Sequence, residues 1–159
     1  MHPNVSRVVE AAAAEGVAIE VRRFPEGTRT AADAARAVGC EVAQIVKSLV
    51  FVADDRPVVA LVSGANRVDL DKLASAAGAT SARRADGDEA RAATGFAIGG
   101  VPPFGHTTAT TILVDRDLES HDIVWAAAGL PDAVFALRPA DLIRASGGKV
   151  VDLADSSAG

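Results

Sequence analysis

The chain has 159 residues, of which 49% are hydrophobic and 23% charged, a length and composition typical of one globular domain. Its net charge of −5 argues against a protein that coats duplex nucleic acid through bulk charge, so a contact with nucleic acid needs a local basic patch. The single cysteine, Cys40, excludes an internal disulfide, and the three histidines are too scattered along the chain to join it in a local metal site.

No apolar stretch reaches the roughly 20 residues that a membrane-spanning helix needs. The opening segment MHPNVSRVVEAAAAEG lacks a basic leader followed by an apolar core, so we expect no signal peptide and a cytoplasmic location. We expect one domain over residues 1–153 and a flexible tail over residues 154–159.

Local signals predict helices and strands that alternate along the chain. Thr30 and Asp33 resemble a capping box that opens a helix ended by Gly39, and Asp86 with Glu89 forms a second such box. The predicted helices cover residues 5–14, 30–37, 41–46, 69–77, 86–95 and 139–145. The predicted strands cover residues 17–24, 48–53, 58–62, 80–84, 110–114, 121–127, 133–137 and 149–153. The turn at residues 54–57 makes a hairpin, which, with the late strands, favours an α+β class with a mixed, largely antiparallel sheet.

Lys47 is the first candidate functional residue. It stands where a helical turn meets a strand of Leu, Val and Phe, a placement that suits a cationic side chain at the mouth of an apolar pocket. An ammonium there would bind phosphate or polarise a carbonyl group. The alternative is an ordinary solvated lysine.

The second candidate is the Gly/Pro-rich segment at residues 99–105, followed by His106. Its glycines allow backbone groups to approach a ligand closely, and Pro102 and Pro103 stiffen the segment, so it suits an oxyanion or amino-group cradle. A tight connection between strands is the alternative. His106 would act as an acid, a base or a ribose contact, or would be structurally bonded.

Familiar hydrolase and nucleotide-binding motifs are absent from the sequence. It has no GxSxG, HExxH, phosphate-loop or GxGxxG pattern. Asp115 ends a strand and suits either a site carboxylate or a turn former. A phosphate-binding rim would form if the fold gathered the basic residues Arg22, Arg23, Arg67, Lys72, Arg83 and Arg84.

Several segments together resemble the YbaK/EbsC group, which is similar to the editing domain inserted in bacterial prolyl-tRNA synthetases. The order and spacing of these segments carry the resemblance, particularly Lys47 followed by the GxxxP pattern from Gly99 to Pro103. The segments that take part are residues 30–35, 44–51, 68–73, 94–96, 99–105, 112–115 and 139–142.

The resemblance implies a barrel-like α+β domain that acts in trans as a deacylase and hydrolyses the ester of a wrongly charged tRNA. It assigns catalysis to Lys47, which would position the acylated 3′ end, and to Gly99 and Gly100, whose backbone would hold the aminoacyl group. It assigns substrate binding to Val101, Pro102, Pro103, Phe104, Gly105, His106, Phe24 and Thr30. It implies no metal or other cofactor. The partners are the 3′ end of a mischarged tRNA and, as an open option, a synthetase, with no membrane and no duplex DNA.

Two departures bear on the amino acid that is removed. The branch of the group specific for cysteinyl-tRNA(Pro) has a tyrosine and an aspartate at the positions of Phe24 and Val134, so both polar groups are missing here. We therefore expect alanine or another small amino acid, carried on tRNA(Pro). Two alternatives stay open, namely a non-catalytic module that binds tRNA ends or a nucleotide, and a small-molecule esterase.

Overall fold

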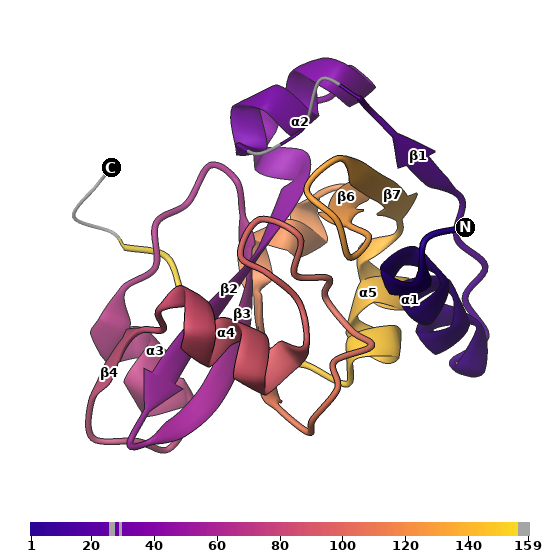
Figure 1. The fold of residues 1–159 in the computed structure, drawn as a ribbon. Coiled ribbons are helices and arrows are strands. Elements are labelled where there is room, and N and C mark those ends of the chain that lie inside the picture. The colour runs from indigo at the N-terminus through magenta and orange to yellow at the C-terminus, as the bar shows by residue number, and fades with distance from the viewer. Residues whose placement is uncertain (26–27, 29, 156–159) are drawn as a thin grey trace.

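A computed structural model describes residues 1–25, 28 and 30–155 (Figure 1). The helices are α1 (Pro3–Ala14), α2 (Ala31–Val38), α3 (Leu70–Ala76), α4 (Gly87–Thr94) and α5 (Pro139–Ser146), with 3₁₀ turns η1 (Val42–Gln44) and η2 (Arg116–Ser120). The strands are β1 (Val21–Arg23), β2 (Ile45–Ala53), β3 (Arg56–Ser63), β4 (Ala82–Arg84), β5 (Thr111–Asp115), β6 (Val124–Ala127), β7 (Ala133–Leu137) and β8 (Lys149–Val151).

All of these strands join one mixed sheet, in the order β1-β7-β6-β2-β3-β5-β8, with β4 paired to β2 outside this path. Pairing is antiparallel in β1·β7, β6·β7, β2·β3 and β2·β4, and parallel in β2·β6, β3·β5 and β5·β8. The predicted α+β class with a mixed, largely antiparallel sheet is therefore confirmed. In Figure 1, α1 and α5 lie together at one end, α3 and β4 lie at the other, and α2 covers the top.

The long hairpin of β2 and β3 is the centre of the sheet. Its two-residue turn holds Asp54 and Asp55 at φ values of 47° and 67°, the left-handed conformation that two-residue hairpins require. On its other side, β2 pairs with β6 only at Ile45 and Val46 and with β4 only at residues 51–53. We call the stretch between these pairings, residues 47–50, the β2 gap.

Alternation along β2 sends successive side chains to opposite faces of the sheet. Val46 and Val50 belong to a core cluster beneath α1, α4 and α5, whereas Phe51 belongs to a second cluster beneath α3. The cross-strand partners follow the same division, since Leu61 lies with the first cluster and Val62 with the second. The hairpin therefore separates two apolar layers.

Capping residues set most helix ends where the sequence predicts them. Thr30 accepts from Asp33 N–H, Asp69 caps α3, and Asp86 with Glu89 forms a reciprocal capping box.

The predicted strand over residues 17–24 is reduced to β1, because β7 pairs with only three of its residues. The predicted strand over residues 121–127 begins only at Val124, because η2 continues to Ser120.

The end of the described chain is held against the sheet. Ala154 pairs with Val68 in an isolated bridge, and Asp155 N–H donates to Arg67 O at 2.8 Å. The first two residues of the predicted flexible tail, 154 and 155, thus make backbone contacts, and its residues 156–159 lie outside the described part. Within that part, none of the helices has the length and apolar character needed to span a bilayer.

Candidate active site

The described residues enclose a cavity of about 270 Å³ at the β2 gap. Its walls come from α2, β2, the start of α4, the loop after α4, and the β6–β7 hairpin. The lining residues are Thr28, Thr30, Ala31, Ala34, Val38, Ile45, Val46, Lys47, Ser48, Leu49, Val50, Arg84, Ala85, Ala90, Ile98, Gly99, Val101, Trp125, Ala126, Ala127, Pro131 and Val134. The cavity exists because β6 and β4 leave β2 unpaired between them.

The two faces of β2 give the cavity two chemically different sides. Ser48 shares its face with Val46 and Val50, on the side of the small apolar residues. Lys47 lies on the opposite face, together with Arg84, which stands across from Phe51 in the β2·β4 pairing. An extended ligand that crosses the β2 edge would therefore meet Lys47 and Arg84 on one side, where alanines of α2 pack against Ile45, and the apolar cluster of Val46 and Val50 on the other.

Lys47 is half-buried, and its ammonium is held in place by a backbone group. Lys47 Nζ donates to Asn66 O at 2.7 Å, across the loop that follows β3. Burial and the nearby charge of Arg84 lower the pKa of Lys47 from its ordinary value, and Arg67 acts in the same direction, while Asp115 opposes the shift. The Lys47 ammonium is thus fixed in position and holds its proton less firmly than an exposed lysine does.

Asp115 is fully buried and organises the loop that holds Lys47. Its Oδ2 accepts from Ser63 N–H at 3.1 Å and from Asn66 Nδ2 at 2.8 Å, and its Oδ1 accepts from Asp117 N–H at 3.0 Å. Asp115 is absent from the cavity lining. Of the two roles that the sequence leaves open, the structure favours the structural one, since this carboxylate fixes Asn66 and, through it, Lys47.

The first residues of the Gly/Pro-rich loop line the cavity, and the following residues are buried outside the lining. Gly99, at φ 93°, and Val101 line the cavity. A Cβ on Gly100 would stand 3.1 Å from the backbone of Leu130, so this glycine permits close packing against the β6–β7 hairpin. Pro102, Pro103 and Phe104 are buried outside the lining, and the Phe104 ring packs on Phe135 at 5.7 Å between centroids.

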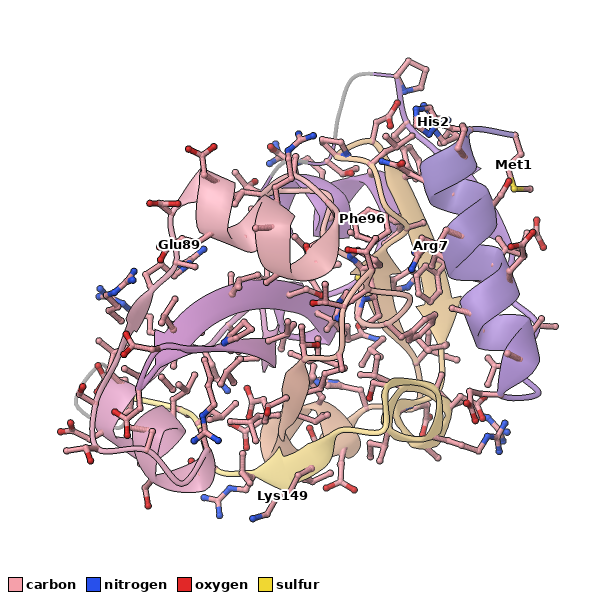
Figure 2. All side chains as sticks on the ribbon, turned by 60° about the horizontal axis from the view of Figure 1, so that its bottom comes forward. Met1, His2, Arg7, Glu89, Phe96 and Lys149 are labelled. Carbon is pink, nitrogen blue, oxygen red and sulfur yellow. The ribbon has the colours of Figure 1, made fainter. Side chains whose placement is uncertain are left out.

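His106 and Gly105 anchor this loop and do not line the cavity. His106 Nε2 donates to Pro102 O at 2.8 Å, and Nδ1 lies 3.0 Å from Thr110 Oγ1. Burial lowers the pKa of His106, so the neutral ring is favoured. Arg7 of α1 donates to Gly105 O at 2.6 Å and to His106 O at 3.1 Å, and Figure 2 shows Arg7 on the side of α1 that faces the rest of the molecule.

Of the two remaining predicted substrate contacts, Thr30 lines the cavity and Phe24 does not. Thr30 lines the cavity as the N-cap of α2. Phe24 lies outside the lining and donates its N–H to Asp132 O at 2.8 Å. Sequence reasoning did not single out the alanines of the wall or Trp125, because only the pairing of β2 with β6 brings the Trp125 ring beside α2.

The predicted basic rim is only partly gathered. Arg23, Lys72 and Arg83 pair with Asp132, Asp152 and Glu89 at 3.0, 2.9 and 2.7 Å. Arg84 lines the cavity and lies over the Phe51 ring, while Arg22 lies over the ring of Trp125 at 5.6 Å. The cations in the described lining are therefore Lys47 and Arg84, and Arg22 contacts the lining residue Trp125.

Comparison with known proteins agrees with this geometry. The model of the aminoacyl-tRNA editing domain family matches residues 25–145. YwhH, an uncharacterized protein of Bacillus subtilis, is 30% identical over 132 residues, which are 82% of this chain and 83% of that protein. A proline–tRNA ligase of Nitratidesulfovibrio vulgaris is 33% identical over 118 residues, which are 74% of this chain but only 20% of the ligase.

Among solved structures, a provisionally assigned trans-editing enzyme for prolyl-tRNA synthetase is 45% identical. It superposes with a TM-score of 0.91 over 98% of this chain and 99% of the other. The fold and the matched residues define a hydrolase domain of tRNA quality control. The chain belongs to the aminoacyl-tRNA editing domain family, and the resemblance to the YbaK/EbsC group is thereby confirmed.

Proposed function

We propose that this protein acts in trans as a deacylase that removes a small amino acid, such as alanine, from mischarged tRNA(Pro). The observation that carries the proposal is the two-sided cavity at the β2 gap. Its cationic side, with Lys47 and Arg84, suits the phosphates and ribose of a tRNA 3′ end, and its apolar side suits a small aminoacyl group.

The apolar wall supports the choice of a small amino acid. Ala85, Ala90 and Ala126 line the cavity in the cluster of Val46 and Val50, while Ala31 and Ala34 of α2 line it beside Ile45, on the Lys47 face. Aminoacyl groups with larger side chains would clash with these walls. Such a clash discriminates more strongly between substrates than one missing methylene group does, which changes the transition-state free energy by only about 1–3 kcal/mol. Val134 also lines the cavity. Since the resemblance implies a carboxylate at this position in the cysteine-specific branch, an apolar aminoacyl side chain is favoured here.

In the proposed chemistry Lys47 positions the substrate, and the described lining supplies no carboxylate, imidazole or thiol. Among the described lining residues there is no aspartate, glutamate, histidine or cysteine. Cys40 lies outside the lining, and burial raises the pKa of its thiol, which disfavours the nucleophilic thiolate. We therefore assign activation of the attacking water to backbone groups and to the free ribose hydroxyl of the substrate. Water adds to the ester carbon, the C–O bond to the ribose breaks, and the ribose oxygen takes the proton.

The relatives support the choice of tRNA and the action in trans. The similarity to proline–tRNA ligases is confined to about one fifth of the Nitratidesulfovibrio enzyme. The solved structure of a provisionally assigned trans-editing enzyme is covered almost entirely. These matches favour tRNA(Pro) as the carrier.

The test is the decay of labelled Ala-, Cys-, Ser-, Thr- and Pro-tRNA(Pro) with the wild-type protein, Lys47→Ala and Lys47→Arg. We expect wild-type hydrolysis of a small mischarged species and a loss of about 100-fold in kcat/KM for Lys47→Ala, the order of magnitude that a misplacement of the reacting groups by about 1 Å can cost. Lys72→Ala, which removes a cation outside the cavity, is the matched control. If every ester survives while the protein still binds and protects acylated tRNA, the protein is a binding module and the proposal is wrong.

A further inference from the structure

Ser48 carries an unexplained polar group in the cavity wall. Among the described residues, Ser48 Oγ is the single buried side-chain nitrogen or oxygen for which the structure shows no hydrogen-bond partner. A buried hydroxyl without a partner is costly, so such groups are rare in folded proteins and call for a reason.

The surroundings of Ser48 make a structural reason hard to find. Its neighbours on the same face of β2 are Val46 and Val50, and its cross-strand partner is Leu61, all in one apolar cluster. Alanine at this position would keep the strand and the packing without a polar atom. The serine is therefore better explained by what enters the cavity than by what surrounds it.

The backbone of Ser48 adds to the polarity at the same point. Val50 O accepts from Ala85 N–H at 3.0 Å, so the peptide groups of Val50 point away from β3 and towards the cavity side of β2. Because the direction of these groups alternates along a strand, the N–H and C=O of Ser48 point to the same side. Ser48 lies within the β2 gap, where neither β6 nor β4 pairs with it.

A small aminoacyl ester brings one group that needs such acceptors. When its side chain is apolar, its polar atoms are the ester oxygens and the α-ammonium group, and a buried cation must be hydrogen-bonded. The described lining offers no carboxylate, Thr28 Oγ1 already donates to Pro131 O, and Thr30 Oγ1 accepts from Asp33 N–H. Among the side chains of the described lining, Ser48 Oγ is therefore the acceptor whose hydrogen-bonding capacity the structure leaves unused.

We propose that Ser48 is a specificity-determining residue that accepts a hydrogen bond from the α-ammonium group of the aminoacyl ester. This inference rests on the proposed function and extends it. It assigns Ser48 to recognition of an amino acid as opposed to other acyl groups, while the alanine walls limit the size of its side chain.

The experiment compares the wild-type protein and Ser48→Ala on two esters of the same tRNA(Pro). One is alanyl-tRNA, and the other is propionyl-tRNA, which keeps the methyl group and lacks the α-ammonium. We expect Ser48→Ala to lower kcat/KM about 10- to 100-fold for alanyl-tRNA, the range for a hydrogen bond to a charged group. For propionyl-tRNA the two proteins should agree within about twofold, because the lost partner is absent.

The Tm of the Ser48→Ala variant is a second measurement. A structural role for Ser48 would lower this Tm, whereas a role in substrate binding would not. Ser48→Ala should leave Tm unchanged or raise it, because it removes an unpaired buried hydroxyl. Ser63→Ala is the matched control: Ser63 is also a buried serine in a strand, but its Oγ donates to Ala43 O at 2.7 Å, so this variant should lower Tm.

The outcomes separate this inference from the proposed function. If the wild-type protein hydrolyses no aminoacyl-tRNA, the proposed function fails and the role of Ser48 fails with it. If the wild-type protein is active but Ser48→Ala is equally active on alanyl-tRNA, or loses the same factor on both esters, only the role of Ser48 is wrong. A fall in Tm for Ser48→Ala similar to that of Ser63→Ala would mark Ser48 as structural.

Discussion

Replacing the buried carboxylate of Asp115 tests whether it holds both the fold and the lysine. Asp115→Ala removes the acceptor for three donors, Ser63 N–H, Asn66 Nδ2 and Asp117 N–H, at 3.1, 2.8 and 3.0 Å. The Ser63 bond is fully buried, so its donor is left without a partner. Asp115→Asn keeps an acceptor for one side of the carboxylate but turns an NH₂ group towards a donor on the other.

The magnitudes follow from the number of bonds. A hydrogen bond to a charged group contributes about 1.5–3 kcal/mol, and bonds in one network do not add fully, so we expect Asp115→Ala to cost about 3–5 kcal/mol. At about 2–4 °C per kcal/mol for a domain of this size, Tm should fall by about 6–20 °C. Asp115→Asn should cost about 1–3 kcal/mol, because one bond is lost.

The assay is reversible urea denaturation followed by circular dichroism, with thermal melts in parallel. Asp117→Ala is the control, because Asp117 Oδ2 accepts only an exposed bond from Asn66 Nδ2 and the variant keeps the backbone N–H that Asp115 binds. We expect it to cost under about 1 kcal/mol, as exposed interactions usually do. If Asp115→Ala loses less stability than Asp117→Ala, the assignment of Asp115 as the organiser of the Lys47 loop is refuted.

Two further predictions concern the Gly/Pro-rich loop. Because burial lowers the pKa of His106 from 6.5, the unfolded chain takes up the proton first, so the free energy of unfolding should fall as pH drops below 6.5. Urea titrations between pH 7.5 and 5 should show this slope in the wild type and in His121→Gln but a weaker one in His106→Gln; equal slopes in all three would contradict it. Gly99→Ala adds a methyl group at the cavity with φ at 93° and should lower kcat/KM, whereas Gly100→Ala presses on the Leu130 backbone and should mainly lower Tm. Deacylation rates and melts of both variants separate these effects, and identical profiles would count against the division of the loop.

Local chemistry made much of the fold predictable from the sequence. The β2–β3 hairpin follows from β-branched runs on either side of Asp54 and Asp55, and the start of α4 follows from Asp86 and Glu89. In each case the decisive contacts join residues close together in the chain. One boundary that failed depends on a distant partner, because residues 17–20 have no strand beside them in the described sheet. The other failed at a local turn, η2, which begins where Asp115 accepts from Asp117 N–H.

The candidate site was predictable only in part, for the same reason. Lys47 and Gly99 stood out by their local setting, and both line the cavity. The proposed role of Ser48 could not be predicted from the sequence, because a serine in a strand has no distinctive pattern. Its position in the cavity wall depends on where β6 and β4 stop pairing with β2, and its lack of a hydrogen-bond partner is visible only in the structure. His106 looked like a chemical group because of its residue type, but its two ring nitrogens are used within the loop.

The anchoring of the loop by Arg7 also bears on the order in which the site is completed during synthesis. The two bonds from Arg7 span 98 and 99 residues of chain, so α1 leaves the ribosome long before the carbonyl groups that it holds. At about 5–20 residues per second, this delay is roughly 5–20 s. Until then the loop that carries Gly99 lacks its tie to α1. A nascent chain therefore completes its binding cavity among the last steps of folding, after the β2–β3 hairpin has emerged.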